Sequence, residues 1–143
     1  MENQMYNQPT PRLNMGQAIR SVLNQYATFK GRARRSEYWW WSLAYGIAYV
    51  AAFTLDVCLG LGNESGMGVL SGILFLAVFI PGIAVLVRRL HDVGHSGWWI
   101  LISLIPFFGG IVILIFCIQD SQPGDNEYGP SPKYGGNEVN YTV

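Results

Sequence analysis

The residues best suited to chemistry are concentrated in the segment 88–99, which reads Arg-Arg-Leu-His-Asp-Val-Gly-His-Ser-Gly-Trp-Trp. Guanidinium groups bind phosphate and carboxylate oxygens through paired hydrogen bonds, so two adjacent arginines are suited to holding an anion. A second basic segment, 30–35, contributes one lysine and three arginines. The two segments together predict a site for an anionic lipid headgroup or a protein partner, with these candidate residues: Arg32, Arg35, Glu37, Arg88, Arg89, His91 and Asp92. The alternative is that these charges only anchor the ends of membrane helices.

The same segment offers two other chemistries. His91 and His95 are four residues apart with Asp92 between them, which is a conceivable ligand set for a metal ion. Gly94 interrupts the helix that would align the two imidazoles, so we expect no metal and no cofactor. An enzyme acting on lipid or peptide could use these groups together with Ser96, provided that they converge on one cleft. We expect a protein that is not an enzyme and keep this alternative open.

The composition indicates the environment of these residues. Half of the 143 residues are hydrophobic and only 13% are charged, whereas soluble domains carry about 25% charged residues. No charged residue occurs in 38–55, 65–87 or 93–119, and about 20 apolar residues suffice for a helix to cross a bilayer. The composition therefore excludes an ordinary soluble enzyme and a nucleic-acid-binding domain. It predicts an all-α, polytopic integral membrane protein.

We expect three transmembrane helices, over about 38–61, 67–87 and 97–118. Ile19, Val22, Leu23 and Tyr26 recur at helical spacing and predict an amphipathic helix over about 14–29, with Asn14 as its N-cap. This helix either lies on the inner leaflet or packs against the ends of the spans. The predicted domains are a disordered N-terminus (1–12), a membrane domain (13–118) and a polar, flexible tail (119–143).

The third span has a weak point at its middle, where the sequence reads Pro-Phe-Phe-Gly-Gly over 106–110. Proline and glycine are tolerated in membrane helices when neighbours satisfy the freed backbone groups, so we expect a kinked helix that crosses fully. The alternative is a re-entrant hairpin that returns the tail to the cytoplasm. Each half of such a hairpin would have only about nine residues, which is short for a crossing.

The orientation follows from the basic residues, which lie before the first span and after the second. Because basic loops stay in the cytoplasm, the N-terminus is expected inside, the loop around Glu64 outside and the C-terminus outside. Aromatic residues anchor helix ends at the interface, and we assign this role to Trp39, Trp40, Trp41, Trp98 and Trp99. Ser36 and Ser96 are the expected helix caps.

Asp56 is the one acidic residue within a predicted span. Its position near the outer end of the first span favours a carboxylate that simply faces the interface. In the alternative of an oligomeric transport or channel subunit, Asp56 and the break at 106–110 line the path. Three spans enclose little space alone, so this alternative requires several copies. The expected partners are membrane lipids, with a second copy or another membrane protein as the alternative and no nucleic acid.

Three motifs in order resemble one protein family. The stretch 29–39 reads Phe-Lys-Gly-Arg-Ala-Arg-Arg-Ser-Glu-Tyr-Trp, 88–99 is the segment given above, and 124–132 reads Gly-Asp-Asn-Glu-Tyr-Gly-Pro-Ser-Pro. Together they resemble domain-of-unknown-function family 805, the YhaH/YhaI-type inner-membrane proteins of bacteria. The resemblance implies a small helical protein of the bacterial inner membrane and no established activity. Glu127 departs from the arginine often found at its position in that family.

Overall fold

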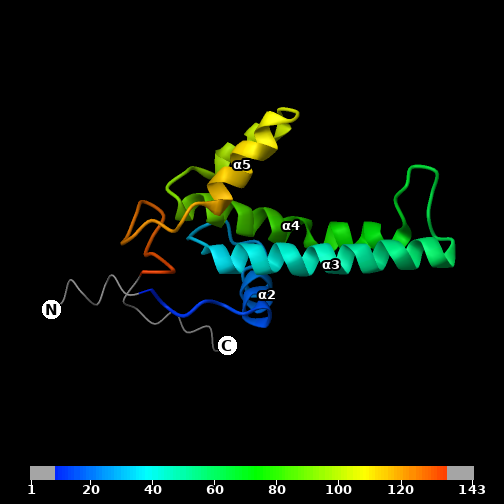
Figure 1. Ribbon diagram of the computed structural model, residues 1–143, viewed down its shortest axis with the longest axis horizontal. Helices are drawn as coiled ribbons and strands as arrows, with labels where there is room; N and C mark the ends of the chain where they lie inside the picture. The colour runs from blue at the N-terminus through cyan, green and yellow to red at the C-terminus, as the bar shows by residue number, and fades with distance from the viewer. Residues whose placement is uncertain (1–8, 135–143) are drawn as a thin grey trace.

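The computed structural model describes residues 9–134, and within this range the regular elements are all helices, with two isolated bridges in the loops between them and in the tail (Figure 1). The elements are α2 (Met15–Asn24), α3 (Arg35–Leu59), α4 (Val69–Asp92), the 3-10 helix η1 (Gly97–Leu104) and α5 (Phe108–Ile118). The predicted disorder of residues 1–8 and the last part of the predicted tail lie outside the described residues.

The two longest helices, α3 and α4, lie side by side as an antiparallel pair joined by the loop 60–68 (Figure 1). They have 25 and 24 residues, or about 36–38 Å of helix, which exceeds the roughly 30 Å hydrocarbon core of a bilayer. The outer surface of the pair is apolar: Val50 and Leu76, for example, are 64% and 72% exposed. Within the described residues these are the two helices long and apolar enough to cross a membrane.

At the loop end of the pair, Asp56 of α3 caps the first turn of α4. Its buried carboxylate accepts hydrogen bonds from the backbone N–H groups of Leu70 and Ser71, both at 2.8 Å, and from the Ser71 hydroxyl. A helix N-terminus has free N–H groups and favours a negative charge. Gly68 is required beside this joint, because an added Cβ there would lie 2.0 Å from an Asp56 oxygen. Asp56 therefore faces neither the interface nor a path through the protein.

Helix α2 begins at the predicted N-cap. The Asn14 side chain accepts from the Gln17 N–H, and the Gln17 side chain accepts from the Asn14 N–H, which forms a capping box. The apolar face of α2 packs through Val22 on Ala33, Trp41 and Val85. Of the two placements considered for this helix, the packing against the ends of the long helices is the one observed, and α2 ends at Asn24 rather than near residue 29.

The third apolar segment is not the continuous, kinked helix that was predicted over 97–118. Helix η1 and α5 form a hairpin that leans away from the α3–α4 pair (Figure 1). The chain reverses at Phe107, whose φ of 68° lies in the left-handed region. The two arms then approach so closely that a Cβ on Gly109 would lie 1.7 Å from the Ile102 carbonyl oxygen. Eight residues of 3-10 helix and eleven of α-helix give each arm a length of about 16 Å, roughly half of the hydrocarbon core.

Because this hairpin returns, residues 119–134 lie at the same end of the α3–α4 pair as residues 9–34 (Figure 1). Backbone and side-chain hydrogen bonds join the two segments directly, since Thr10 donates to the carbonyls of Lys133 and Pro132. The N-terminal segment and the tail therefore lie together at one end of the α3–α4 pair, and not at its opposite ends as three full spans would place them.

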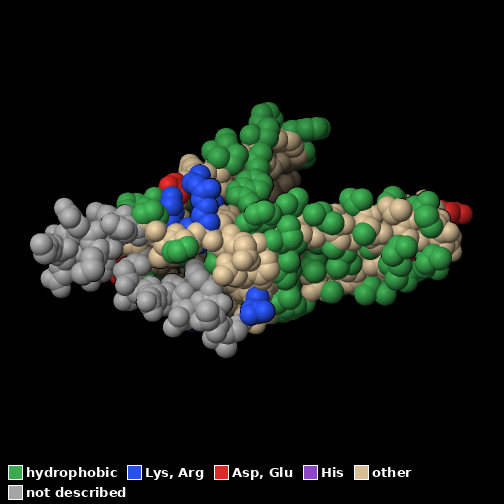
Figure 2. Space-filling model, turned by 60° about the horizontal axis from the view of Figure 1, so that its bottom comes forward, with side chains coloured by type: hydrophobic (Ala, Val, Ile, Leu, Met, Phe, Trp, Pro, Cys, Tyr) green, Lys and Arg blue, Asp and Glu red, His purple; other side chains and the backbone are tan. Residues whose placement is uncertain are grey.

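The cations are confined to one end of the molecule, where they meet several acids. All nine Lys and Arg residues fall in 12–35, 88–89 and 133, within the segments that gather at one end. The loop end carries Asp56 and Glu64. Figure 2 shows Lys and Arg side chains near one end with acidic side chains beside them, hydrophobic side chains along the rod, and further acidic side chains at the opposite tip. We call the end with the nine cations the basic end.

Candidate functional site

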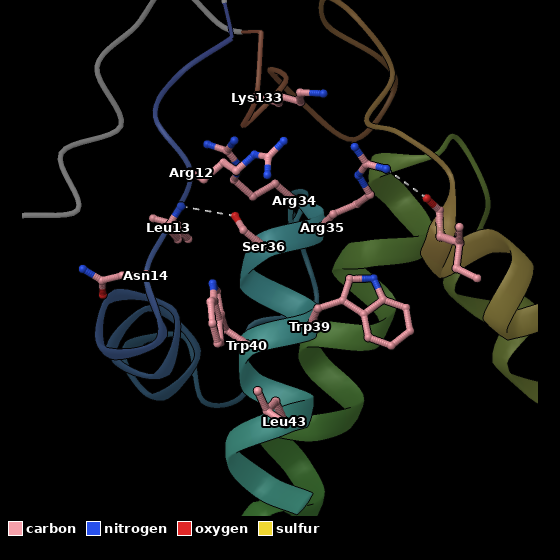
Figure 3. Close-up of a pocket in the computed structure, with 11 residues that line it drawn as sticks. Arg12, Leu13, Asn14, Arg34, Arg35, Ser36, Trp39, Trp40, Leu43 and Lys133 are labelled. Atoms are coloured by element: carbon pink, nitrogen blue, oxygen red, sulfur yellow. Dashed lines mark hydrogen bonds between the residues drawn. The ribbon is translucent and has the colours of Figure 1, made fainter.

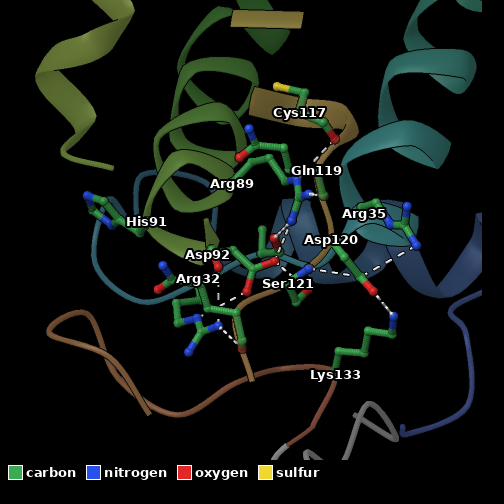
Figure 4. A network of polar contacts seen from close by, with 12 residues as sticks. Arg32, Arg35, Arg89, His91, Asp92, Cys117, Gln119, Asp120, Ser121 and Lys133 are labelled. Carbon is green, nitrogen blue, oxygen red and sulfur yellow. Dashed lines mark hydrogen bonds and ion pairs between the residues drawn. The ribbon is translucent and has the colours of Figure 1, made fainter. Parts of the chain in front are cut away.

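The centre of the basic end is the buried carboxylate of Asp92, the last residue of α4 (Figure 4). Its Oδ1 accepts from Arg32 Nε at 3.0 Å, and its Oδ2 accepts from the Ser121 hydroxyl at 2.6 Å and from Arg89. The side chains of Asp92 and both arginines are at most 1% exposed. A buried carboxylate is stable as an ion only when it is paired and hydrogen-bonded in this way.

Arg32 ties the tail to the end of α4. Its Nη2 donates to the carbonyl oxygens of Asp92, at 3.2 Å, and Gln122, at 2.7 Å. Its Nη1 donates to those of Gly124, at 2.8 Å, and Gly129, at 3.3 Å. The planar guanidinium group offers five N–H donors in a fixed fork, and here they hold four separate points of the chain.

Arg89 ties the end of the hairpin to the end of α4. Its Nε donates to the carbonyl of Cys117 at 3.3 Å, its Nη1 donates to that of Ala33 at 3.3 Å, and its Nη2 donates to that of Gln119. The last turn of a helix has carbonyl groups without helical partners, and a cation satisfies them. Arg89 therefore fixes the point at which the chain leaves α5.

A second ion pair joins the three helices next to this network. Arg88 Nη1 lies 2.9 Å from Glu37 Oε1, and the Ser21 hydroxyl of α2 donates to the same oxygen at 3.0 Å. The remaining Nε and Nη2 groups of Arg88 have no hydrogen-bond partner among the described residues. Arg88 is fully buried, so the pair holds α2, α3 and α4 together rather than facing an open surface.

His91 and the tail form the last part of the network. The imidazole stacks on the ring of Tyr128, with 3.9 Å between centroids and 2° between planes, and its Nδ1 lies 3.0 Å from the Gly31 carbonyl oxygen. The Asn126 amide donates to the His91 carbonyl at 2.9 Å. His95 instead packs on Phe116, 4.0 Å between ring centroids.

These contacts show where the predicted site residues lie. Six of the seven candidates are buried in the network, and the donors of Arg32 and Arg89 are directed at protein oxygens rather than into an open pocket. The seventh, Arg35, has a side chain 43% exposed. The four groups of the enzyme alternative are each engaged in a structural contact: His91 stacks on Tyr128, Asp92 pairs with two arginines, His95 packs on Phe116 and Ser96 caps η1. Within residues 9–134 no group of three or more His, Cys, Asp or Glu side chains is placed to hold a metal ion.

Two predictions about the helix ends need correction. Helix α3 begins at Arg35 with Arg34 as N-cap and no side-chain cap, while the Ser36 hydroxyl accepts instead from the Leu13 N–H at 3.3 Å. Trp41 is only 7% exposed and belongs to the core, so it is not an interfacial anchor. Ser96 does cap η1, accepting from the Trp98 N–H, and the other four tryptophans are exposed.

An open groove lies beside the network, and sequence reasoning did not find it (Figure 3). It has a volume of about 940 Å³ and runs along the first turns of α3, with these lining residues: Arg12, Leu13, Asn14, Arg34, Arg35, Ser36, Trp39, Trp40, Leu43, Ile118 and Lys133. The groove depends on the return of the hairpin, because Ile118 and Lys133 reach α3 only when the chain turns back. No sequence signal predicted the two outlying cations Arg12 and Lys133.

Asp120 sits at the edge of the groove between two of its cations. Its carboxylate lies 2.6 Å from Lys133 Nζ and 3.4 Å from Arg35 Nη2, and it accepts from the Ser121 N–H and the Tyr134 hydroxyl. Partial burial acts to raise the pKa of Asp120, but these hydrogen bonds and the Arg35 charge outweigh it and lower the pKa to about 2.

The comparisons with known proteins agree with this fold and with the motifs. A family model described as "Protein of unknown function (DUF805)" matches residues 26–130, nearly three-quarters of the chain. The chain belongs to the DUF805 family. As predicted from its three motifs, it is therefore a member of a family of membrane proteins.

Two curated DUF805 relatives give the location. The chain is 46% identical over 112 residues to "Inner membrane protein YhaH" of Escherichia coli (strain K12), covering 78% of this chain and 93% of that protein. It is 41% identical over 117 residues to "Inner membrane protein YhaI" of the same strain, covering 82% and 96%. No solved structure matches the chain. These relatives and the two apolar helices make this DUF805 protein an inner membrane protein of helical fold.

The range matched by the DUF805 model contains the buried network from Arg32 to Gly129. The two outlying cations of the groove, Arg12 and Lys133, lie outside it. The network thus belongs to the family-matched part of the chain, whereas the groove is completed by the flanking segments of this chain.

Proposed function

We propose that this protein is a non-enzymatic membrane module that crosses the inner membrane twice and binds anionic lipid headgroups at its basic end. Residues 9–34 and 119–134 then lie on the cytoplasmic side, and the loop 60–68 lies outside. The observation that carries the proposal is the gathering of all nine Lys and Arg residues at one end of the α3–α4 pair.

The positive-inside rule supports this orientation. Basic residues are retained in the cytoplasm, and the opposite end of this molecule has two acidic residues and no Lys or Arg. With the tail on the basic side, no basic residue needs to be translocated. In this placement the η1–α5 hairpin enters the cytoplasmic leaflet and does not cross it.

Electrostatics supports the choice of ligand. Each Lys or Arg near an anionic membrane surface contributes about 1 kcal/mol of attraction. Arg12, Arg20 and Lys30 are exposed at this end, and Arg35 is partly exposed. Inside the fold Arg88 pairs with Glu37, and Arg32 and Arg89 share Asp92, so the exposed cations are the ones available to lipid.

The burial of the earlier candidates favours a scaffold over catalysis and transport. The groups suggested for interfacial catalysis are each held by a structural contact. Asp56, which the transport alternative placed along a path, caps α4. The network joins α3, α4, α5 and the tail at one point, which is what a rigid platform at the membrane surface requires.

Lipid competition tests the proposal. The purified protein is mixed with equal amounts of phosphatidylglycerol and phosphatidylcholine of the same acyl chains, and native mass spectrometry counts the lipids retained. We expect phosphatidylglycerol to be retained several-fold more often, and less so at high ionic strength. Equal retention of the two lipids would contradict the proposed function.

A further inference from the structure

The groove beside the network changes in character along the axis of α3. Figure 3 shows Lys133, Arg12 and Arg35 at one end of the groove, the indoles of Trp39 and Trp40 below them, and Leu43 farther along the helix. Ile118 of α5 also lines the groove, next to Arg35, whose Nη1 donates to the Ile118 carbonyl oxygen at 3.4 Å. The order along the helix is thus cationic, then aromatic, then aliphatic.

This order is the order of the layers of a membrane leaflet. Cations attract phosphate at the headgroup level, Trp rings prefer the interface, and Leu and Ile belong to the hydrocarbon region. Because α3 is one of the two helices that cross, its axis leads from the surface into the bilayer. The groove therefore opens to lipid along its length rather than to water alone.

The cations of the groove differ in how firmly they are engaged. Arg12 makes no hydrogen bond or ion pair with residues 9–134. Arg35 makes only long contacts, at 3.4 Å, to Asp120 and to the Ile118 carbonyl. Lys133 is held by Asp120 at 2.6 Å. The fourth lining cation, Arg34, is buried and donates to Thr10 and Pro11. Arg12 and Arg35 are therefore the guanidinium groups available to a phosphate.

The tryptophans add fixed walls and one further donor. Trp39 is held by its Nε1–H, which donates to the Cys117 carbonyl at 3.3 Å, and by an edge contact with Tyr38. The Nε1–H of Trp40 has no partner within the described part of the chain. Indole N–H groups at membrane interfaces usually find a polar partner, and here the charged end of the groove lies next to it.

We propose that this groove holds one anionic glycerophospholipid of the cytoplasmic leaflet. Its phosphate lies between Arg12 and Arg35, its glycerol region lies between the two tryptophans, and an acyl chain follows Leu43 and Ile118. This inference rests on the proposed function and names its site. The volume of about 940 Å³ is more than a headgroup alone requires and leaves space for part of a chain.

Asp120 acts as a competitor for the same cations. A phosphate that binds Arg35 meets the Asp120 carboxylate, which already pairs with Arg35 and Lys133. A phosphate and the Asp120 carboxylate bound to the same cation repel each other, so Asp120 weakens the binding of any anionic lipid. Removing its charge therefore strengthens lipid binding, which is opposite to the effect expected of a residue that only stabilises the fold.

The test compares two double variants that lose the same charge. Arg12→Gln/Arg35→Gln removes the two available guanidinium groups of the groove, while Arg20→Gln/Lys30→Gln removes two exposed cations of the basic end outside it. The lipid competition between phosphatidylglycerol and phosphatidylcholine is repeated on the full chain. We expect the first variant to lose about tenfold or more of the preference for phosphatidylglycerol, and the second to lose much less.

Asp120→Asn and Leu43→Gln complete the design, since both positions are exposed. We expect Asp120→Asn to raise phosphatidylglycerol retention a few-fold and Leu43→Gln to lower it. Soluble glycerophosphoglycerol, which lacks acyl chains, should not displace the bound lipid. Displacement by this compound at equal concentration would overturn the role of the aliphatic end.

The outcomes separate the two proposals. If the unaltered protein has no preference for phosphatidylglycerol, the proposed function fails and the site fails with it. If the preference exists and the two double variants lose it equally, the function stands as general surface attraction and the groove is overturned. Loss confined to the groove variant, with retention raised by Asp120→Asn, supports the site.

Discussion

At the scale of single residues, arginines at the basic end have two separate roles that the sequence does not distinguish. Arg32 and Arg89 are buried and donate to carbonyl groups of the tail and of the hairpin's end, whereas Arg12 and Arg35 remain open to the groove. That these arginines form a basic cluster could be predicted from residue type and spacing. Which of them are buried and which stay open could not be predicted, because it depends on which carbonyl groups the returning tail presents.

Arg32 tests the structural role directly. Arg32→Ala leaves the Asp92 carboxylate with one buried cation instead of two and releases the carbonyls of Gln122, Gly124 and Gly129. Removing one partner of a buried pair costs about 3–5 kcal/mol, so we expect the free energy of unfolding to fall by about 3 kcal/mol. Unfolding by denaturant in mixed micelles measures it.

Arg20→Ala is the matched control, because Arg20 is exposed and makes no contact with the tail. Its effect should stay within about 0.5 kcal/mol. A loss of less than about 1 kcal/mol for Arg32→Ala would show that the tail is not held by this residue.

Asp120 gives a pH dependence whose sign follows from its lowered pKa. The value of about 2 in the folded protein lies below the ordinary 3.8. The stabilising contacts of the ionised group are therefore complete above about pH 4 and are lost as the pH falls toward 2. Because the side chain is 43% exposed, solvent screens the interaction, and a titration shows the effect better than a melting temperature.

Carboxyl chemical shifts of Asp120 in micelles provide that titration. We expect a midpoint near 2 in the unaltered protein. The hydrogen bond from Lys133 makes the largest contribution to lowering the pKa of Asp120. Lys133→Gln weakens this bond, so the midpoint should move up toward 3.8. An identical midpoint in both proteins would remove Lys133 from the explanation.

At the scale of elements, the sequence predicted the two long helices and the capped amphipathic helix, because each is encoded by local periodicity and caps. The third apolar segment shows a feature that local sequence signals do not predict, namely its fold as a hairpin. The break at 106–110 was visible, but length favoured a kinked crossing over a hairpin with short arms. The hairpin is set by the left-handed Phe107 and by the close contact of Gly109 with Ile102, which are properties of a tertiary approach.

The tail is a second case at this scale. Its composition predicts that residues 119–134 do not fold alone, since they contribute few apolar side chains. Their order comes from partners distant in sequence: the guanidinium of Arg32, the ring of His91 and the backbone of Thr10. The far-end cap at Asp56 was likewise missed, because its recipients on α4 lie 14 and 15 residues away.

Two neighbouring glycines test the hairpin. Gly109→Ala places a methyl group 1.7 Å from the Ile102 carbonyl, so the arms must separate, whereas Gly110→Ala points into open space. Overpacking of this kind costs about 1–3 kcal/mol. We expect Gly109→Ala to lower the free energy of unfolding by at least about 2 kcal/mol. Gly110→Ala should be neutral or slightly stabilising, since alanine is the better helix former.

The same unfolding measurement in mixed micelles compares the two variants. Equal effects of the two substitutions would mean that η1 and α5 do not approach closely and that the segment is extended.

At the scale of the whole molecule, the return of the hairpin changes the meaning of the charge distribution. Although the net charge is zero, all nine cations and most of the acids meet at one end, where several of them neutralise each other inside the fold. The opposite end carries two acids, Asp56 near the end of α3 and Glu64 in the loop 60–68. The groove between α3, the N-terminal segment and the tail exists only because both segments lie at the basic end.

The side of the membrane on which the tail lies is the most direct test of this account. In a Cys58→Ala background, where the remaining Cys117 is buried, single cysteines replace Glu64 in the loop and Asp125 in the tail, two exposed carboxylates. Intact cells with a permeabilised outer membrane are treated with a maleimide that cannot cross the inner membrane. The account predicts labelling of Glu64→Cys at once and of Asp125→Cys only after the inner membrane is opened. Labelling of Asp125→Cys in intact cells would contradict it, because the tail would then lie outside and the hairpin would be a third crossing.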